Sequence, residues 1–279
     1  SHSSKPERAK NLSIALDWLQ QTFQHAPVLG SLINPRKSDA AKIVNWPQLQ
    51  EALSSALESS QQTDEATFEA QVAAQGLTKA AQLLSKQYSW VITNVPYLAR
   101  GKQSDVLKDY CEKHHAAAKN DLATVFLDRC LQLNEHGGHS SIVLPQNWLF
   151  LTSYKKFREQ LLKQDTWNLI ARLGPKGFQT PMWDFNVQLL GITRGQENEG
   201  LLLGNEDNGH ELRGLDVSEE KSAADKAESL LVEEVKSVSQ AGQLENPDLR
   251  ISMAEQASGV LLDQSNECYQ GLVTGDIER

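Results

Sequence analysis

The hydrophobic pattern divides the chain into a helical first third and a mixed remainder. Apolar residues recur at helical spacing over residues 5–25, and residues 48–57 and 65–86 are rich in Ala, Gln, Leu and Glu, which favour helices. Prolines and a glycine interrupt residues 27–47, so this stretch is expected to connect helices. Residues 1–86 therefore predict a mainly helical layer or insertion that packs on the next unit and carries no evident chemistry.

After this layer the pattern changes to alternating strands and helices, which is typical of a doubly wound α/β sheet with helices on both faces. The short apolar runs predict strands at residues 90–93 (a buried strand), 141–144, 169–173 and 185–193. The last strand follows only a short loop, so it is expected to pair antiparallel. Helices are predicted at residues 104–114, from a cap at Asp121 to Asn134 with Gly137-Gly138 as its stop, and at 154–163.

The regular order weakens beyond Gly195. Residues 196–214 are rich in Glu, Asn, Asp and Gly and predict a loop with a short strand at 201–203. Residues 217–240 predict a charged helix, and residues 250–253 a short strand.

The most informative stretch is the end of the first predicted strand, Asn94-Val95-Pro96-Tyr97. Pro96 cannot donate to a ladder and holds Val95 extended, so an amide, a backbone carbonyl and an aromatic ring are presented where ligands bind in open α/β sheets. The Asn94 oxygen and the Val95 carbonyl are two acceptors suited to an exocyclic amino group, and Tyr97 offers a stacking face. An Asn-x-Pro turn with a core tyrosine explains the same four residues equally well.

These four residues resemble motif IV of the amino-methyltransferases that use S-adenosylmethionine, usually written Asn/Asp/Ser-Pro-Pro-Tyr/Phe. Val95 replaces the first proline but keeps the carbonyl through which the family uses that position. RNA and protein-glutamine methyltransferases share the motif, so it does not by itself name the amine.

Further pieces, in the same order and spacing, extend the resemblance over residues 85–195. Together they are similar to the large adenine-specific DNA methyltransferases of restriction–modification and phage-defence systems. The pieces are Asp121-Leu122 with Phe126 and Arg129, Gly137-Gly138 with Ile142 to Pro145, Tyr154 to Arg158 with Leu161-Leu162, Leu173-Gly174 with Gly177-Phe178, Asn186-Val187, and more weakly Gly271 to Asp276.

The resemblance implies a Rossmann-like methyltransferase sheet and a reaction on adenine flipped out of double-stranded DNA. It implies that Asn94 and the Val95 carbonyl accept hydrogen bonds from the adenine amino group and that Tyr97 stacks on the base. Positioning would then supply most of the rate without a tuned general base. Phe178 is the candidate second aromatic wall, or else a core residue; Asp121 is a candidate cofactor contact, or else a helix cap.

The family's glycine-rich cofactor loop, Asp-x-x-x-Gly-x-Gly, is not found in this sequence. The chain is therefore expected to be the middle piece of a longer parent chain, inactive alone, without the upstream cofactor half and the downstream DNA-reading domain. Three segments are predicted: a helical layer (1–86), the α/β catalytic-core portion (87–195), and a loop, helix and connector region (196–279).

The charge balance limits how this chain can contact DNA. The 279 residues carry a formal net charge of −9 and have a pI near 5.3, which argues against a self-sufficient DNA binder. Arg100 and Lys102, and also Lys155, Lys156 and Arg158, are candidate phosphate contacts; a solvated basic face is the alternative.

The remaining features of the sequence concern the cellular compartment, metal binding and the alternative functions. Cys111, Cys130 and Cys268 are too few and scattered for a disulfide framework, which fits a reducing cytoplasm, and no apolar run reaches the ~18 residues of a membrane helix. His136/His139, and Cys111 with His114-His115, lack zinc-site spacing, so no metal is expected. A protein-glutamine or RNA methyltransferase, and a non-catalytic interaction module with this fold, remain alternatives.

Overall fold

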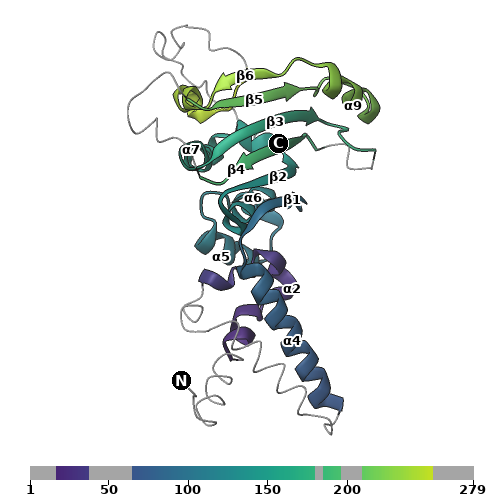
Figure 1. Cartoon of the computed structure of the whole chain (residues 1–279), viewed down its shortest axis with the longest axis vertical. Helices are drawn as coiled ribbons and strands as arrows, with labels where there is room; N and C mark the ends of the chain where they lie inside the picture. The colour runs from purple at the N-terminus through teal and green to yellow at the C-terminus, as the bar shows by residue number, and fades with distance from the viewer. Residues whose placement is uncertain (1–16, 38–64, 180–184, 196–208, 254–279) are drawn as a thin grey trace, which may run out of the picture.

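The computed structural model describes residues 17–37, 65–179, 185–195 and 209–253. They build a six-stranded sheet in the order β1-β2-β4-β3-β5-β6, seen as the stacked arrows of Figure 1. This confirms the α/β class. The strands are β1 (Tyr88–Asn94), β2 (Asn134–Pro145), β3 (Thr166–Gly174), β4 (Val187–Thr193), β5 (Glu211–Asp216) and β6 (Lys236–Ser239).

The directions of the strands determine where the functional loops gather. β1 runs parallel to β2, and β3 runs parallel to β5, whereas β4 is antiparallel to both β2 and β3, as predicted. β6 is antiparallel to β5. The carboxyl ends of β1, β2, β3 and β5 therefore lie along one edge of the sheet.

The helices agree with the sequence pattern in the middle of the chain. The Asp121 side chain caps α6, as expected, and the Ser104 side chain caps α5. In the first third, α4 confirms the predicted helix at 65–86 and residues 17–23 are helical, while the helix predicted at 48–57 lies outside the described residues. The helices are α2 (Ala26–Leu29), α4 (Glu65–Ser85), α5 (Asp105–His114), α6 (Leu122–Leu133), α7 (Lys155–Gln164) and α9 (Ala223–Val232).

The two faces of the sheet are covered unequally by the described residues. On one face, Leu190 of β4 belongs to the main core that includes apolar residues of α6 and α7. On the other face, Val187 belongs to a small cluster with Leu173 and Val217, against which Leu230 of α9 packs. Helices thus contact both faces, but α9 contacts the second face only near the carboxyl edge.

The first strand is less buried than its composition predicted. β1 is the edge of the sheet in the described part of the chain, and its Trp90 and Ile92 side chains are 61% and 72% exposed. The prediction of a buried strand was therefore wrong for this face. Aromatic and β-branched residues favour an extended strand, but they do not reveal what covers it.

Two glycines that were expected to end a helix belong instead to a strand. α6 ends at Leu133, and Gly137 and Gly138 lie inside β2, which is longer than predicted. Gly137 has a φ of 77°, and a Cβ at Gly138 would lie 2.8 Å from the Tyr88 carbonyl oxygen. Here the glycines permit the close approach of β1 to β2, where the strand register shifts.

The last third of the described chain differs most from the prediction. β5 lies partly within the predicted loop at 196–214, and the single helix predicted at 217–240 is replaced by α9 and β6. Residues 250–253 form no strand, and the strand predicted at 201–203 lies outside the described residues. The many Glu and Lys residues favour a helix, but β6 is stabilised by its pairing with β5, a tertiary contact that overrides the local preference.

A buried arginine connects α7 to two segments that contain short 3-10 helices, η5 (Asn147–Leu149) and η9 (Pro247–Leu249). Arg158 is fully buried, and its guanidinium donates hydrogen bonds to the backbone oxygens of Leu249 at 2.7 Å, Asp248 at 2.7 Å, Leu151 at 2.8 Å, and Trp148. This arrangement excludes the surface phosphate contact that was considered for Arg158. Its charge is used to hold the turn after β2 and the 248–249 segment together.

Replacing Arg158 with Met should lower the free energy of unfolding by about 3 kcal/mol or more, because several buried carbonyls lose a charged donor. The exposed Lys156, on the same helix, gives a matched control: Lys156→Met should stay within about 0.5 kcal/mol of the wild type. Urea unfolding followed by tryptophan fluorescence measures both, and equal losses would contradict the role given to Arg158.

Asp165 should make stability depend on pH. It is buried after α7, where its carboxylate accepts the Gly195 N–H at 3.0 Å, and burial raises its pKa to about 6. The pKa of this side chain in the unfolded chain is about 3.9, so the neutral carboxyl group of Asp165 favours the folded state. This stabilisation is complete below about pH 4 and is lost as the pH rises through about 6, where Asp165 ionises in the folded protein.

Asp165→Asn keeps an acceptor but cannot ionise. The variant should therefore gain stability relative to the wild type at pH 8, by about 3 kcal/mol, and lose that advantage at pH 4. Unfolding curves at both pH values measure this difference. A difference that does not change with pH would show that ionisation of Asp165 is not the cause.

Candidate active site

The segment Asn94-Val95-Pro96-Tyr97 lies at the carboxyl end of β1, as predicted. Val95 is buried in the main core and its N–H donates to the Val143 carbonyl at 3.3 Å, so the segment continues along β2 beyond the last residue of β1. The Asn94 side chain is exposed, and the Tyr97 hydroxyl donates to its Oδ1 at 3.2 Å. The structure therefore brings the amide and the ring together at the edge where the parallel strands end.

The loop that follows is fastened to the start of α6. Ala99 and Asp121 form an antiparallel bridge, and the Leu122 N–H donates to the Leu98 carbonyl at 3.0 Å. The Asp121 side chain caps the helix by accepting the Ala123 N–H at 2.9 Å, and it also accepts the Leu98 N–H at 3.4 Å. Asp121 thus serves as the helix cap; its proposed contact with a cofactor stays a prediction.

A second aromatic ring faces Tyr97, but it is not the one chosen from the sequence. The Phe185 ring lies 5.6 Å from the Tyr97 ring, centroid to centroid, with the planes inclined by 58°, and Phe185 is 45% exposed. Phe178 is partly buried in the small cluster with Leu173 and Val187, which Tyr97 also contacts. In the sequence, Phe185 belongs to the fourth predicted strand, and the structure places it just before β4. This position next to the start of a strand is the signal that could have identified it as a site residue.

The environment of Tyr97 keeps its hydroxyl protonated. Partial burial raises the pKa of this phenol above its ordinary value of 10.0. At neutral pH the hydroxyl therefore remains a donor toward Asn94, and the ring remains an uncharged stacking surface.

The predicted basic contacts divide into paired and unpaired groups. Arg100 forms an ion pair with Glu112 at 2.9 Å, and Glu112 also accepts Lys119 at 2.5 Å. Lys155 lies 3.7 Å from Asp248. Lys102 is exposed and forms no ion pair in the part of the chain that the structure describes. Of the two basic residues nearest the motif, Lys102 is therefore the one free to meet an anion.

A cavity of about 270 Å³ lies on the α6 side of the loop, lined by residues that include Asp121, Thr124, Trp148 and Tyr154. The Trp148 indole N–H is buried without a hydrogen-bond partner, and burial raises the pKa of Tyr154 to about 12. Asn94 and Tyr97 do not line this cavity. The cavity is therefore separate from the site formed by Asn94 and Tyr97, although Asp121 lies next to both.

No group of three or more His, Cys, Asp and Glu side chains that could hold a metal occurs among the described residues. His139 instead contacts the Thr193 hydroxyl at 3.1 Å, and Cys111 is a buried free thiol whose pKa burial raises to about 11. None of the helices in the described ranges has the length and apolar character needed to span a bilayer.

Comparison with known families tests the resemblance drawn from the sequence. The model of the Eco57I restriction-modification methylase family matches residues 11–178, which is more than half of the chain. The chain belongs to this family. The resemblance predicted from the sequence is confirmed, and most of the helical first third, which carried no motif, lies within the matched region.

Two curated relatives are named as adenine-specific methyltransferases. The protein PglX of Lacticaseibacillus casei (strain Zhang) is 33% identical over 107 residues, which are 38% of this chain and 9% of that protein. The protein BrxX of Escherichia coli O9:H4 (strain HS) is 31% identical over 156 residues, which are 56% of this chain and 12% of that protein. The chain thus matches only about a tenth of the length of these relatives.

Similar solved structures include two complexes with DNA. A DrdV–DNA complex has a TM-score of 0.42 and 16% identity, covering 59% of this chain and 18% of that chain. The ATP-dependent Type ISP restriction-modification enzyme LlaBIII bound to DNA has a TM-score of 0.42 and 13% identity, covering 63% of this chain and 14% of that chain.

Asp121→Ala should destabilise the protein by about 1 kcal/mol because it removes the cap of α6, and it also removes the contact with Leu98. Asp121→Asn keeps a capping oxygen and should stay within a few tenths of a kcal/mol of the wild type. Thermal unfolding measures both variants. An alanine variant as stable as the wild type would contradict the anchoring role of Asp121.

Proposed function

We propose that this chain forms the amine-binding part of an S-adenosylmethionine-dependent methyltransferase that acts on the amino group of adenine in DNA. The observation that carries the proposal is the placement of the Asn94 amide, the Val95 carbonyl and the Tyr97 ring at one end of β1. Family membership and the names of the two curated relatives support adenine as the target.

The two acceptors explain how the chain activates an amine. Asn94 Oδ1 and the Val95 carbonyl accept the two N–H groups, so the nitrogen lone pair is directed away from them and toward the methyl donor. The Tyr97 hydroxyl, donating to the same Oδ1, restrains the amide plane. The proton leaves after transfer, so positioning and electrostatics supply the rate without a general base.

The spacing of the aromatic pair predicts a movement when a base enters. Two stacking contacts of about 3.5 Å each require about 7 Å between rings, whereas the Tyr97 and Phe185 centroids are 5.6 Å apart. A base that stacks between the two rings therefore requires Phe185 to move away from Tyr97, and Phe185 then becomes its second wall in place of, or together with, Phe178.

S-adenosylmethionine, when bound, supplies the electrophilic methyl group. Within this chain, Asp121 is the residue proposed to contact it, beside the 270 Å³ cavity that Asp121 lines. The other contacts are assigned to the remainder of a longer parent chain. Two observations support this assignment: the match to about a tenth of the relatives' length, and the exposed Trp90 and Ile92 on the edge strand β1.

Double-stranded DNA is the proposed partner of the parent protein, and the cytoplasm its proposed location. The free, buried thiols of Cys111 and Cys130 fit a reducing compartment.

In the parent protein, Asn94→Ala should lower methylation by ~100-fold or more, because a single positioned hydrogen-bonding group in an active site contributes at this level. Asn94→Asp keeps an acceptor oxygen and should retain part of the activity. Ser89→Ala, an exposed polar change on the same strand, is the control and should be silent. Digestion of host DNA to nucleosides and mass spectrometry of N6-methyladenine give the measurement.

Methylation that persists in Asn94→Ala would contradict the role of this residue. Unmodified DNA from a folded, cofactor-binding wild-type parent would contradict adenine as the substrate and favour a protein-glutamine or RNA amine. Failure of the wild-type parent to bind S-adenosylmethionine would favour a non-catalytic interaction module.

A further inference from the structure

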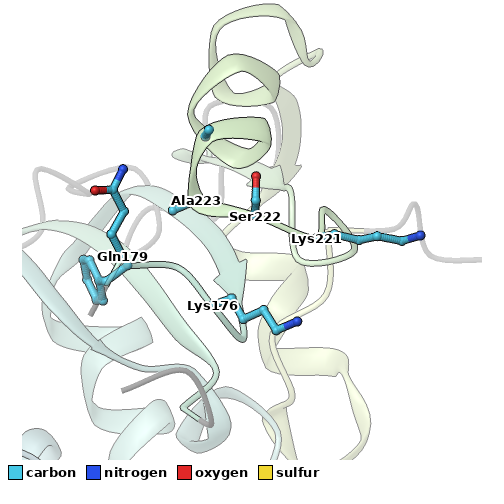
Figure 2. Close-up of a pocket in the computed structure, with 7 residues that line it drawn as sticks. Lys176, Gln179, Lys221, Ser222 and Ala223 are labelled. Atoms are coloured by element: carbon cyan, nitrogen blue, oxygen red, sulfur yellow. The ribbon is translucent and has the colours of Figure 1, made fainter. Parts of the chain in front are cut away.

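A hollow of about 460 Å³ opens between the loop after β3 and the start of α9 (Figure 2). Lys176, Phe178 and Gln179 line it from the loop, and Lys221 and Ser222 line it from the turn before the helix. The first residues of α9 are alanines, whose small side chains leave the hollow open to solvent.

The hollow lies on the same edge of the sheet as the candidate active site. Lys176 follows β3 and Lys221 follows β5, and both strands end at the edge where β1 ends. Phe178, which lines the hollow, packs in the small apolar cluster that Tyr97 also contacts. A ligand in the hollow would therefore be a near neighbour of a base held at Tyr97.

The two lysines are unpaired cations on an acidic chain. Within the described ranges, neither takes part in a hydrogen bond or an ion pair, in contrast to Arg100, which is paired with Glu112. Figure 2 shows their side chains extending in the same direction from the two sides of the hollow. Glu219 and Glu220 precede Lys221 and are exposed, but neither forms an ion pair with either lysine.

We propose that Lys176 and Lys221 bind phosphodiester groups of the DNA strand that carries the target base. The proposal rests on the proposed function, because it takes the nearby Tyr97 as the place of the flipped base. An ammonium group is a compact point charge suited to a phosphate oxygen. With a formal net charge of −9, the chain can attract DNA only through such local groups.

The test measures how DNA affinity depends on salt in the parent protein. Binding of a fluorescein-labelled 30-base-pair duplex is followed by anisotropy between 50 and 200 mM NaCl. Each phosphate contact contributes about 0.9 to the slope of log affinity against log salt. The double variant Lys176→Ala/Lys221→Ala should therefore reduce the slope by about 1.8, and Lys176→Arg/Lys221→Arg should keep it.

Lys79→Ala/Lys86→Ala is the matched control, because it removes the same charge from exposed residues at the amino side of β1. Its slope should equal that of the wild type. A slope for the Lys176/Lys221 alanine variant that equals the control's would overturn the proposal, as would a parent protein that does not bind the duplex at 50 mM NaCl.

The readout is independent of methyl transfer. An unchanged slope together with normal N6-methyladenine overturns only the phosphate contacts. A reduced slope together with a wild-type parent that never methylates adenine supports the contacts and overturns the proposed function.

Discussion

The antiparallel bridge between Ala99 and Asp121 is the constraint on which the candidate active site depends. A loop that follows a strand is ordinarily among the more mobile parts of a protein. Here the bridge and the Asp121 carboxylate join the loop to the first turn of α6, whose apolar residues are buried in the main core. The four residues before the loop are held from the other side by β2, through the bond from Val95 to Val143. The amide and the carbonyl are thus positioned by rigid elements on both sides.

The strand order gives this anchored segment its surroundings. Because β1, β2, β3 and β5 end at one edge, loops far apart in the sequence meet there: the motif after β1, Phe185 before β4, and the two lysines after β3 and β5. Arg158 holds the turn after β2 against residues 248 and 249, so that turn too has a fixed place. The topology of the sheet therefore brings Phe185 and the two lysines to the edge at which the continuous stretch Asn94-Val95-Pro96-Tyr97 lies.

The sequence could predict whatever is encoded locally. The strand ending in Asn94-Val95-Pro96-Tyr97, the cap at Asp121 and the antiparallel strand before Thr193 all follow from short-range patterns, and the structure contains each of them. The features that sequence reasoning missed depend on distant partners. Trp90 is exposed because β1 is an edge, β6 is stabilised by pairing with β5, and Phe185 faces Tyr97 only through the fold. The roles of the individual site residues stay predictions.

The central claim is that this edge of the sheet holds an adenine amino group for methylation. A structure of the parent protein with a DNA duplex and S-adenosylhomocysteine tests it most directly. The account predicts an adenine outside the duplex, stacked on Tyr97, with its amino group within hydrogen-bonding distance of Asn94 Oδ1 and the Val95 carbonyl. A flipped base bound elsewhere, or Asn94 and Tyr97 still bonded only to each other in the complex, would contradict it.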